Sequence, residues 1–415
     1  MSMMYRRKAG IALRAGAVLL ALLGTSCSPS TTDPAQSSSP AVAVPPSPTG
    51  PSFAREVRPL LVAKMKELRV PGAVVLVDVP GQGLWLDALG VGDIKTGGPM
   101  AVADHVRIGS ITKTMTATLA LQLVDEGKIS LDAPVSAYIA GVPNGSKITI
   151  RELLNMTSGL YSYNDDDDFN RALEASPRRV WKYDEILKYA YSHPVTAPGK
   201  EYSYSNTNYV LLGMIAEKLT RRSLPALFRE RLFEPLGMRD SRFPDPPDAS
   251  LPAPYAHGYD FAGPLQIGRA INAAVAGDAS AGITAPAGAQ PSDTTGWNPS
   301  WATSAGAVIS TAKDLRIWAE ALATGSLLKP ATQTERLQHD GSPYGLGVGI
   351  FPNGAIGHTG VLPGYQSHMQ FLPARKAVLI VLTNLQAAPN VPWAKALPAD
   401  QLAQIITKHL ALGGT

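Results

Sequence analysis

Cysteine is almost absent from this chain, since Cys27 is the only one among 415 residues. A single cysteine excludes an intrachain disulfide and leaves no set of thiolate ligands for zinc. The chain also lacks a His-Glu-x-x-His pair, a Gly-x-Ser-x-Gly turn and a phosphate-binding glycine loop after a strand. These absences argue against a metalloprotease, an α/β-hydrolase and a nucleotide-binding enzyme, and they predict neither metal nor cofactor.

Charge is sparse as well. Only 17% of the residues are charged, 45% are hydrophobic, and the formal net charge is +4. Four positive charges lie in residues 1–26, which hold no acid, so the remainder is formally neutral. Nothing therefore favours a nucleic-acid partner. The length allows one large hydrophobic core or two modest ones.

Residues 1–26 are predicted to be a signal peptide, because a basic start, an apolar run at 11–23 and small residues precede Cys27. The apolar run is too short to span a membrane comfortably. A lone cysteine after such a segment favours lipidation of Cys27, which would anchor an exported protein to the outer face of the cell membrane. The preceding residues resemble a bacterial lipobox, although Gly24 stands where that motif prefers leucine. A free thiol behind an ordinary secretory signal is the alternative.

Residues 27–52 are predicted to form a linker. The stretch 28–52 contains seven prolines, seven serines and three threonines, with Asp33 as its only charge. Such a composition buries too little apolar area to offset the entropy of ordering, so we expect an extended tether. No comparable linker follows, and a single folded domain is predicted over residues 53–412.

The folded part begins and ends with strand patterns. Residues 72–79 and 83–92 are rich in apolar and β-branched residues and flank Pro80-Gly81, which predicts a hairpin. Residues 345–351, 364–372 and 377–384 predict three further antiparallel strands, followed by a helix over 399–410.

Helical patterns fill the centre. Residues 111–126 have apolar residues every four positions before Gly127, and residues 208–220 form a second predicted helix. The section 131–323 is predicted to be mostly helical, the acidic run 165–168 to be a solvated loop, and 243–301 to be irregular loops that cover a cleft.

Three short motifs carry chemistry. Ser-x-x-Lys occurs at Ser110 and Lys113, Tyr-x-Asn occurs only at Tyr204 and Asn206, and His358 begins a His-Thr-Gly motif. Each has a weak signal alone, because Ser-x-x-Lys recurs at 310–313 and 326–329 and Lys-Thr-Gly occurs at 95–97. Only the first set falls in this order along the chain.

A serine hydroxyl is a weak nucleophile at neutral pH, so it needs a neighbouring base and donors for the oxyanion that it creates. Helical spacing places Lys113 one turn beyond Ser110 on the same face, within reach of the hydroxyl. The first turn of the helix also offers backbone N–H groups and a dipole that favour negative charge. The alternative is a purely structural role, in which Ser110 caps its helix and Lys113 extends into solvent.

These motifs, together with the flanking sequences 108–113, 153–160 and 301–306, resemble the serine β-lactamase and penicillin-recognising DD-peptidase superfamily. The resemblance is to its class C β-lactamase and DD-carboxypeptidase branch and covers nearly all of the chain after the linker. It implies an α+β fold in which an antiparallel sheet is flanked by helices. It also implies a mostly helical subdomain, with the active site between the two.

The resemblance implies a role for each catalytic residue. Ser110 would be the nucleophile, Lys113 its base with a lowered pKa, and Tyr204 the group that passes the proton to the leaving group. Which of Lys113 and Tyr204 acts as the base stays open.

The same resemblance assigns the binding residues. Asn206 would hold the substrate amide, His358 and Thr359 would engage the substrate carboxylate, and Gly360 would allow close backbone approach. The N–H groups of Ser110 and Val361 would hold the oxyanion. Trp301 would contact the substrate, with a place in the core as the equal alternative.

The substrate class is less well defined. Histidine in the third motif and Trp301 resemble the DD-carboxypeptidase side of the branch, but residues 344–357 lack the arginine that grips a terminal carboxylate there. We predict a serine hydrolase for D-amino-acid peptides. A carboxylesterase or weak β-lactamase on the same site is the first alternative. A non-catalytic envelope protein that binds muropeptide or penicillin is the second.

Overall fold

The computed structural model describes residues 50–412. The predicted signal peptide, Cys27 and most of the predicted linker lie outside these residues. Helix α1 (Ser52–Leu68) opens the described part, with Phe53, Val57 and Leu61 buried along one side. Within residues 50–412, no helix is both long and apolar enough to cross a membrane.

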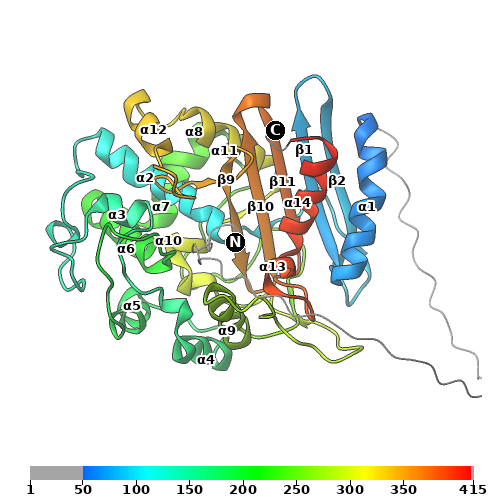
Figure 1. Ribbon diagram of the computed structural model, residues 1–415, viewed down its shortest axis with the longest axis horizontal. Coiled ribbons are helices and arrows are strands. Elements are labelled where there is room, and N and C mark those ends of the chain that lie inside the picture. Colours follow the sequence, from blue (N-terminus) through cyan, green and yellow to red (C-terminus); the bar gives the residue numbers. More distant parts are fainter. Residues whose placement is uncertain (1–49, 413–415) are drawn as a thin grey trace, which may run out of the picture.

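A seven-stranded antiparallel sheet forms the centre of the molecule, in the order β3-β2-β1-β11-β10-β9-β8 (Figure 1). The predicted hairpin strands are confirmed, and β1 pairs with both β2 and β11. Its strands are β1 (Gly72–Val79), β2 (Gly83–Asp93), β3 (Gly98–Pro99), β8 (Gly349–Ile350), β9 (Ile356–Leu362), β10 (Tyr365–Leu372) and β11 (Ala377–Thr383).

Both faces of the sheet are covered, which explains why its central strands are almost continuously apolar. Ala73, Val75 and Val77 point to a core shared with α1 and α14 (Pro398–His409). Val74 and Leu76 point to the opposite core, where α11 (Ala312–Thr324) packs on β1, β10 and β11. Figure 1 shows α1 and α14 beside the sheet, opposite the helical part of the molecule.

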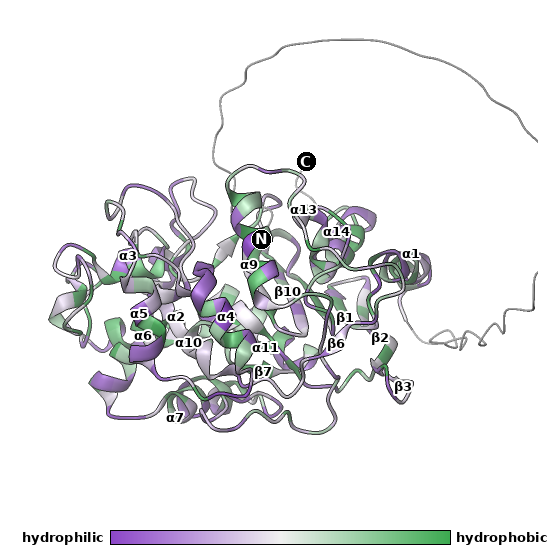
Figure 2. Ribbon diagram, turned by 90° about the horizontal axis from the view of Figure 1, so that it is seen from below, coloured by the Kyte–Doolittle hydropathy of each residue, from purple (hydrophilic) through white to green (hydrophobic). Residues whose placement is uncertain are grey.

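The helical subdomain lies beyond the larger core, and Figure 2 shows its helices on the side of the sheet away from α1. Ser110 lies between the sheet and the helical subdomain, because the turn Gly109–Ile111 leads into α2 and contacts β9. The remaining α-helices of the described residues, in either part of the fold, are α2 (Thr112–Asp125), α3 (Ile150–Leu154), α4 (Asp167–Ala175), α5 (Tyr183–Tyr191), α6 (Asn206–Thr220), α7 (Leu224–Phe228), α8 (Glu234–Leu236), α9 (Pro264–Val275), α10 (Thr303–Gly306), α12 (Pro330–Leu337) and α13 (Trp393–Ala396). Short strands β4 (Val106–Arg107), β5 (Tyr259–Asp260), β6 (Ser292–Asp293) and β7 (Ile309–Ser310) pair outside the main sheet.

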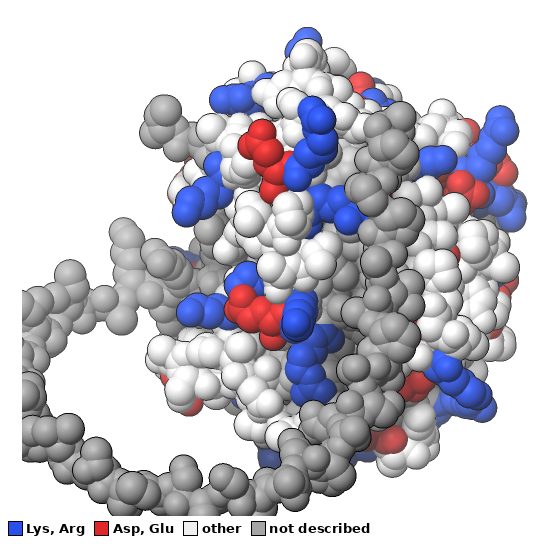
Figure 3. Space-filling model, turned by 90° about the vertical axis from the view of Figure 1, so that its right-hand side faces the viewer, with Lys and Arg blue, Asp and Glu red and all other residues white. Residues whose placement is uncertain are grey.

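The face that carries α1 has charges of both signs. Figure 3 shows Lys and Arg side chains beside Asp and Glu there. Arg58 pairs with Asp87, and Lys64 pairs with Glu67 within α1. Such interspersed charges keep a surface soluble without building a field of one sign.

The α+β architecture is confirmed, but three local predictions are wrong. The strand predicted over 345–351 is reduced to β8, while β9, which was missed, carries His358 in its interior. The loop predicted over 243–301 contains the 12-residue helix α9. The acidic run 165–168 is not a plain loop, because Asp166 accepts a hydrogen bond from the Phe169 N–H and caps the N-terminus of α4, which begins at Asp167.

Candidate active site

Two glycines bring the nucleophile segment against the sheet. Gly109 has a φ of +54°, and a Cβ on it would lie 2.6 Å from the Val361 nitrogen. A Cβ on Gly360 would lie 2.0 Å from the carbonyl oxygen of Ile108. The backbone of β9 therefore lies directly beside the Ser110 segment, which leaves room only for glycine at both positions.

Lys113 is completely buried on α2, and its Nζ has three close neighbours. Nζ lies 3.0 Å from Ser110 Oγ, 2.5 Å from Asn206 Oδ1 and 2.7 Å from the Ala305 carbonyl oxygen. Burial holds the pKa of Lys113 well below its usual value. A neutral amine donates two hydrogen bonds and keeps one lone pair. Asn206 Oδ1 and the Ala305 carbonyl oxygen can only accept, so a neutral amine that donates to both has its lone pair left for Ser110 Oγ.

Tyr204 precedes α6 and is buried, and its side chain hydrogen bonds to Ser110. Burial raises the pKa of the Tyr204 phenol well above its ordinary value, and the bond to Ser110 opposes this only in part. The phenol therefore stays protonated at neutral pH. Asn206 begins α6 and donates to Asn164 Oδ1 at 2.6 Å, so that its Oδ1 is turned toward Lys113.

His358 lies inside β9 with both ring nitrogens occupied. Nδ1 contacts the carbonyl oxygen of Thr359, which can only accept, so Nδ1 carries the proton. Nε2 lies 2.9 Å from the hydroxyl of Tyr344 and accepts from it. Burial and the nearby Lys113 lower the pKa of His358 to about 3, which keeps the ring neutral.

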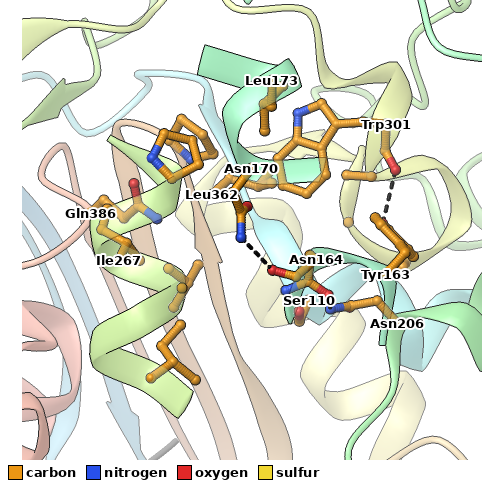
Figure 4. A pocket seen from close by; sticks show the side chains of 18 of the residues that line it. Ser110, Tyr163, Asn164, Asn170, Leu173, Asn206, Ile267, Trp301, Leu362 and Gln386 are labelled. Atoms are coloured by element: carbon orange, nitrogen blue, oxygen red, sulfur yellow. Dashed lines mark hydrogen bonds between the residues drawn. The ribbon is translucent and has the colours of Figure 1, made fainter. Parts of the chain in front are cut away.

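A pocket with a volume of about 70 Å³ opens beside Ser110 between the two parts of the fold (Figure 4). Its apolar wall includes Leu173 from α4, Ile267 from α9 and Trp301. In Figure 4, Asn164 bridges the Asn170 and Asn206 side chains. The remaining lining residues are Ser110, Tyr163, Tyr204, Pro264, Gly268, Ile271, Ala302, Ala305, Gly306, Val361, Leu362, Pro363 and Gln386.

The structure brings all three sequence motifs together, but not all of their residues reach the pocket. Ser110, Tyr204, Asn206, Val361 and Trp301 line it. Lys113 lies beneath Ser110. By contrast, His358, Thr359 and Gly360 are not among its lining residues, and the first two are buried.

Sequence reasoning missed the wall opposite β9. Asn164 and Asn170 lie on either side of the acidic run 165–168, which we predicted to be a solvated loop. Ile267, Gly268 and Ile271 belong to α9, which lies in the stretch predicted to be irregular loops. A signal was available for α9, because Pro264 is a favourable first residue and Ile267, Ala270 and Ile271 follow at helical spacing. Among residues 50–412, no cluster of three or more His, Cys, Asp or Glu is arranged to hold a metal.

Comparison with known proteins identifies the family. The Beta-lactamase family model matches residues 57–403. Esterase EstB of Burkholderia gladioli is 32% identical over 206 residues, which are 47% of this chain and 52% of the esterase. The D-alanyl-D-alanine-carboxypeptidase/endopeptidase AmpH of Escherichia coli (strain K12) is 34% identical over 34% of this chain and 38% of its own. The chain thus spans about half or less of the length of these curated relatives.

A solved structure covers much more of the chain. A D-stereospecific amidohydrolase from Streptomyces sp. superposes with a TM-score of 0.67 at 30% identity. That match covers 84% of this chain and 97% of the amidohydrolase. The likeness therefore includes both the sheet and the helical subdomain.

Proposed function

Because this chain belongs to the Beta-lactamase family, whose model spans most of its length, we propose that it is a serine hydrolase that works through an acyl-enzyme on Ser110. The observation that carries the proposal is the 3.0 Å contact between Lys113 Nζ and Ser110 Oγ. That amine is buried and its pKa is lowered, which favours the neutral form that can take the proton of the hydroxyl.

In the first half-reaction, Ser110 Oγ attacks the substrate carbonyl and its proton passes to Lys113 Nζ. The negative charge on the tetrahedral intermediate is held by the backbone N–H groups of Ser110 and Val361, which Gly109 and Gly360 bring close together. The intermediate then expels an amine or alcohol, which receives the proton through the Tyr204 hydroxyl. The product is an ester between Ser110 and the acyl group.

In the second half-reaction, a water molecule attacks that ester. Its proton returns to Lys113, Ser110 leaves with a proton, and a carboxylic acid is released. We assign the base role to Lys113 because its lowered pKa favours a neutral amine, whereas the raised pKa of Tyr204 keeps the phenol protonated. Asn206 positions Lys113 through Oδ1 and presents its amide group at the pocket.

The proposed substrates are compounds of D-amino acids: peptides, amides or esters. This proposal is supported by the relatives named above, which are a D-alanyl-D-alanine-carboxypeptidase/endopeptidase, an esterase and a D-stereospecific amidohydrolase. The apolar wall formed by Leu173, Ile267 and Trp301 suits a small apolar acyl group.

Export and attachment of a lipid to Cys27 remain part of the proposal and rest on the sequence of residues 1–27 alone. They would place the site outside the cytoplasm, where D-amino-acid compounds of the cell wall occur. Metabolic labelling with a fatty acid, beside a Cys27→Ala variant, tests the attachment.

One experiment tests the catalytic proposal. The full-length protein and its Ser110→Ala variant are incubated with a p-nitrophenyl ester and analysed by mass spectrometry after rapid quenching. We expect an added acyl mass on the peptide that contains Ser110 and turnover that the variant loses. Equal turnover by a folded Ser110→Ala variant contradicts the proposal, as does ligand binding by both forms without any turnover.

A further inference from the structure

The wall of the site that faces Ser110 is electrically neutral. The pocket lining contains no Asp, Glu, Lys, Arg or His among the residues that the structure describes there. Its polar members are hydroxyl and amide groups, such as Asn164, Asn170 and Gln386. Such groups orient a substrate by hydrogen bonds but do not neutralise a charge.

The strands that pass Ser110 supply no cation either. No Lys or Arg occurs from residue 337 to residue 374, a stretch that contains β8, β9 and β10. For a substrate carboxylate placed along β9, the titratable group on that strand is His358, and the basic side chain that contacts Ser110 is Lys113.

His358 has no donor left for such a carboxylate. Its Nδ1 proton is directed at the carbonyl oxygen of Thr359, and its Nε2 accepts from Tyr344. The ring is 1% exposed and does not line the pocket. Both of its hydrogen-bonding positions are thus used inside the protein, and it brings no positive charge.

Lys113 is committed in the same way. Asn206 Oδ1 and the Ala305 carbonyl oxygen accept from its Nζ, and Ser110 Oγ fills the third position. Fully buried, the amine cannot turn toward a group in the pocket. A carboxylate that enters this site would lose its hydration without gaining a paired cation, which is costly.

We propose that the site selects acyl compounds whose leaving group carries no carboxylate, namely amides and esters, over peptides with a free C-terminus. The inference rests on the proposed acyl-enzyme chemistry and narrows its substrate class. It favours amide and ester hydrolysis over the carboxypeptidase activity that the sequence predicted.

A matched pair of esters tests it. Full-length protein is assayed with 3-acetoxybenzamide and 3-acetoxybenzoate, which share the acyl group and differ in the charge of the leaving group. Each kcat/KM is divided by the rate constant for hydrolysis by hydroxide. We expect the normalised kcat/KM to be about tenfold or more higher for the benzamide ester than for the benzoate ester. We also expect N-acetyl-D-alanyl-D-alanine amide to be hydrolysed faster than N-acetyl-D-alanyl-D-alanine, which has a free C-terminal carboxylate. Equal or reversed preference for the ester pair overturns the inference.

A charge variant gives an independent readout. Val361 lines the pocket and is partly exposed, so we compare Val361→Arg with the neutral Val361→Gln. The arginine should raise the benzoate to benzamide ratio at least fivefold above that of the glutamine variant. A ratio within one preparation does not depend on the folded fraction. An unchanged ratio contradicts the inference. If the wild type hydrolyses neither ester and Ser110 is not acylated, the proposed function itself is contradicted.

Discussion

Gly360 lies directly against the carbonyl oxygen of Ile108, so that a Cβ on Gly360 would stand 2.0 Å from that oxygen. The same Cβ would lie 2.5 Å from Ser367 Oγ, which donates to the Ile108 carbonyl. A strand of the sheet and the segment before the nucleophile are therefore in backbone contact. The relative position of Ser110 and Val361 depends on that contact.

Replacing Gly360 by alanine should separate these two backbones, because neither the carbonyl nor the strand can move without disturbing the other. We expect kcat/KM for an ester to fall by about 10²–10³, the loss typical of one missing oxyanion donor. Gly296→Ala is the matched control, since a Cβ there meets nothing closer than 3.8 Å. Stopped-flow acylation rates separate this loss from an effect on binding, and a Gly360→Ala variant with normal acylation contradicts the assignment.

The lowered pKa of Lys113 predicts a pH dependence of stability. Between that lowered pKa and the ordinary value of 10.5, the unfolded chain holds a proton on Lys113 that the folded chain does not. The free energy of unfolding of the wild type should therefore rise with pH in this range, relative to Lys113→Met. Urea titrations at several pH values measure the difference. Lys147→Met, at an exposed position outside the site, is the control. A flat difference for Lys113→Met would argue that the amine is protonated in the folded protein.

The lowered pKa of His358 predicts a change in folding stability at acidic pH. Its pKa is about 3 in the folded protein against an ordinary 6.5, so the unfolded chain gains a proton between these values that the folded chain rejects. Stability should fall on acidification through this window by about 1.4 kcal/mol per pH unit from this group. His358→Gln should lose less stability than the wild type between pH 6.5 and 4. His339→Gln, outside the site, serves as the control, and parallel curves for all three proteins would contradict a neutral buried His358.

The sequence predicted the parts of the site that depend on local spacing. Ser110 and Lys113 share one face of a helix, and that relation follows from helical geometry alone. Gly360 and Ile108 are far apart in the chain, and nothing in the spacing of residues indicates which carbonyl a glycine approaches. The motif order pointed to the three segments, but the backbone contact that positions them appears only in the folded protein.

The missed features have a common physical cause. The sequence of β9 does not predict a strand, because Gly357 and Gly360 interrupt its apolar pattern. Its position is set by pairing with β10. Helix α9 lies in a stretch rich in glycine and alanine, where tertiary packing on α4 outweighs a weak local pattern. Likewise, the hydrogen bonds that occupy His358 depend on Tyr344, 14 residues earlier, and not on the His-Thr-Gly motif.

Gly268 on helix α9 lines the pocket that we propose for the acyl group. A Cβ on Gly268 would lie 2.7 Å from Asn170 Nδ2, which donates to the Asn164 carbonyl oxygen at 2.9 Å. Gly268→Ala should therefore push Asn170 into the pocket and narrow it. We expect kcat/KM for a p-nitrophenyl phenylacetate to fall about tenfold, while the acetate ester changes less than twofold. The ratio of the two esters within each protein removes differences in folding. Equal losses for both esters would mean that α9 supports the fold without bounding the acyl group.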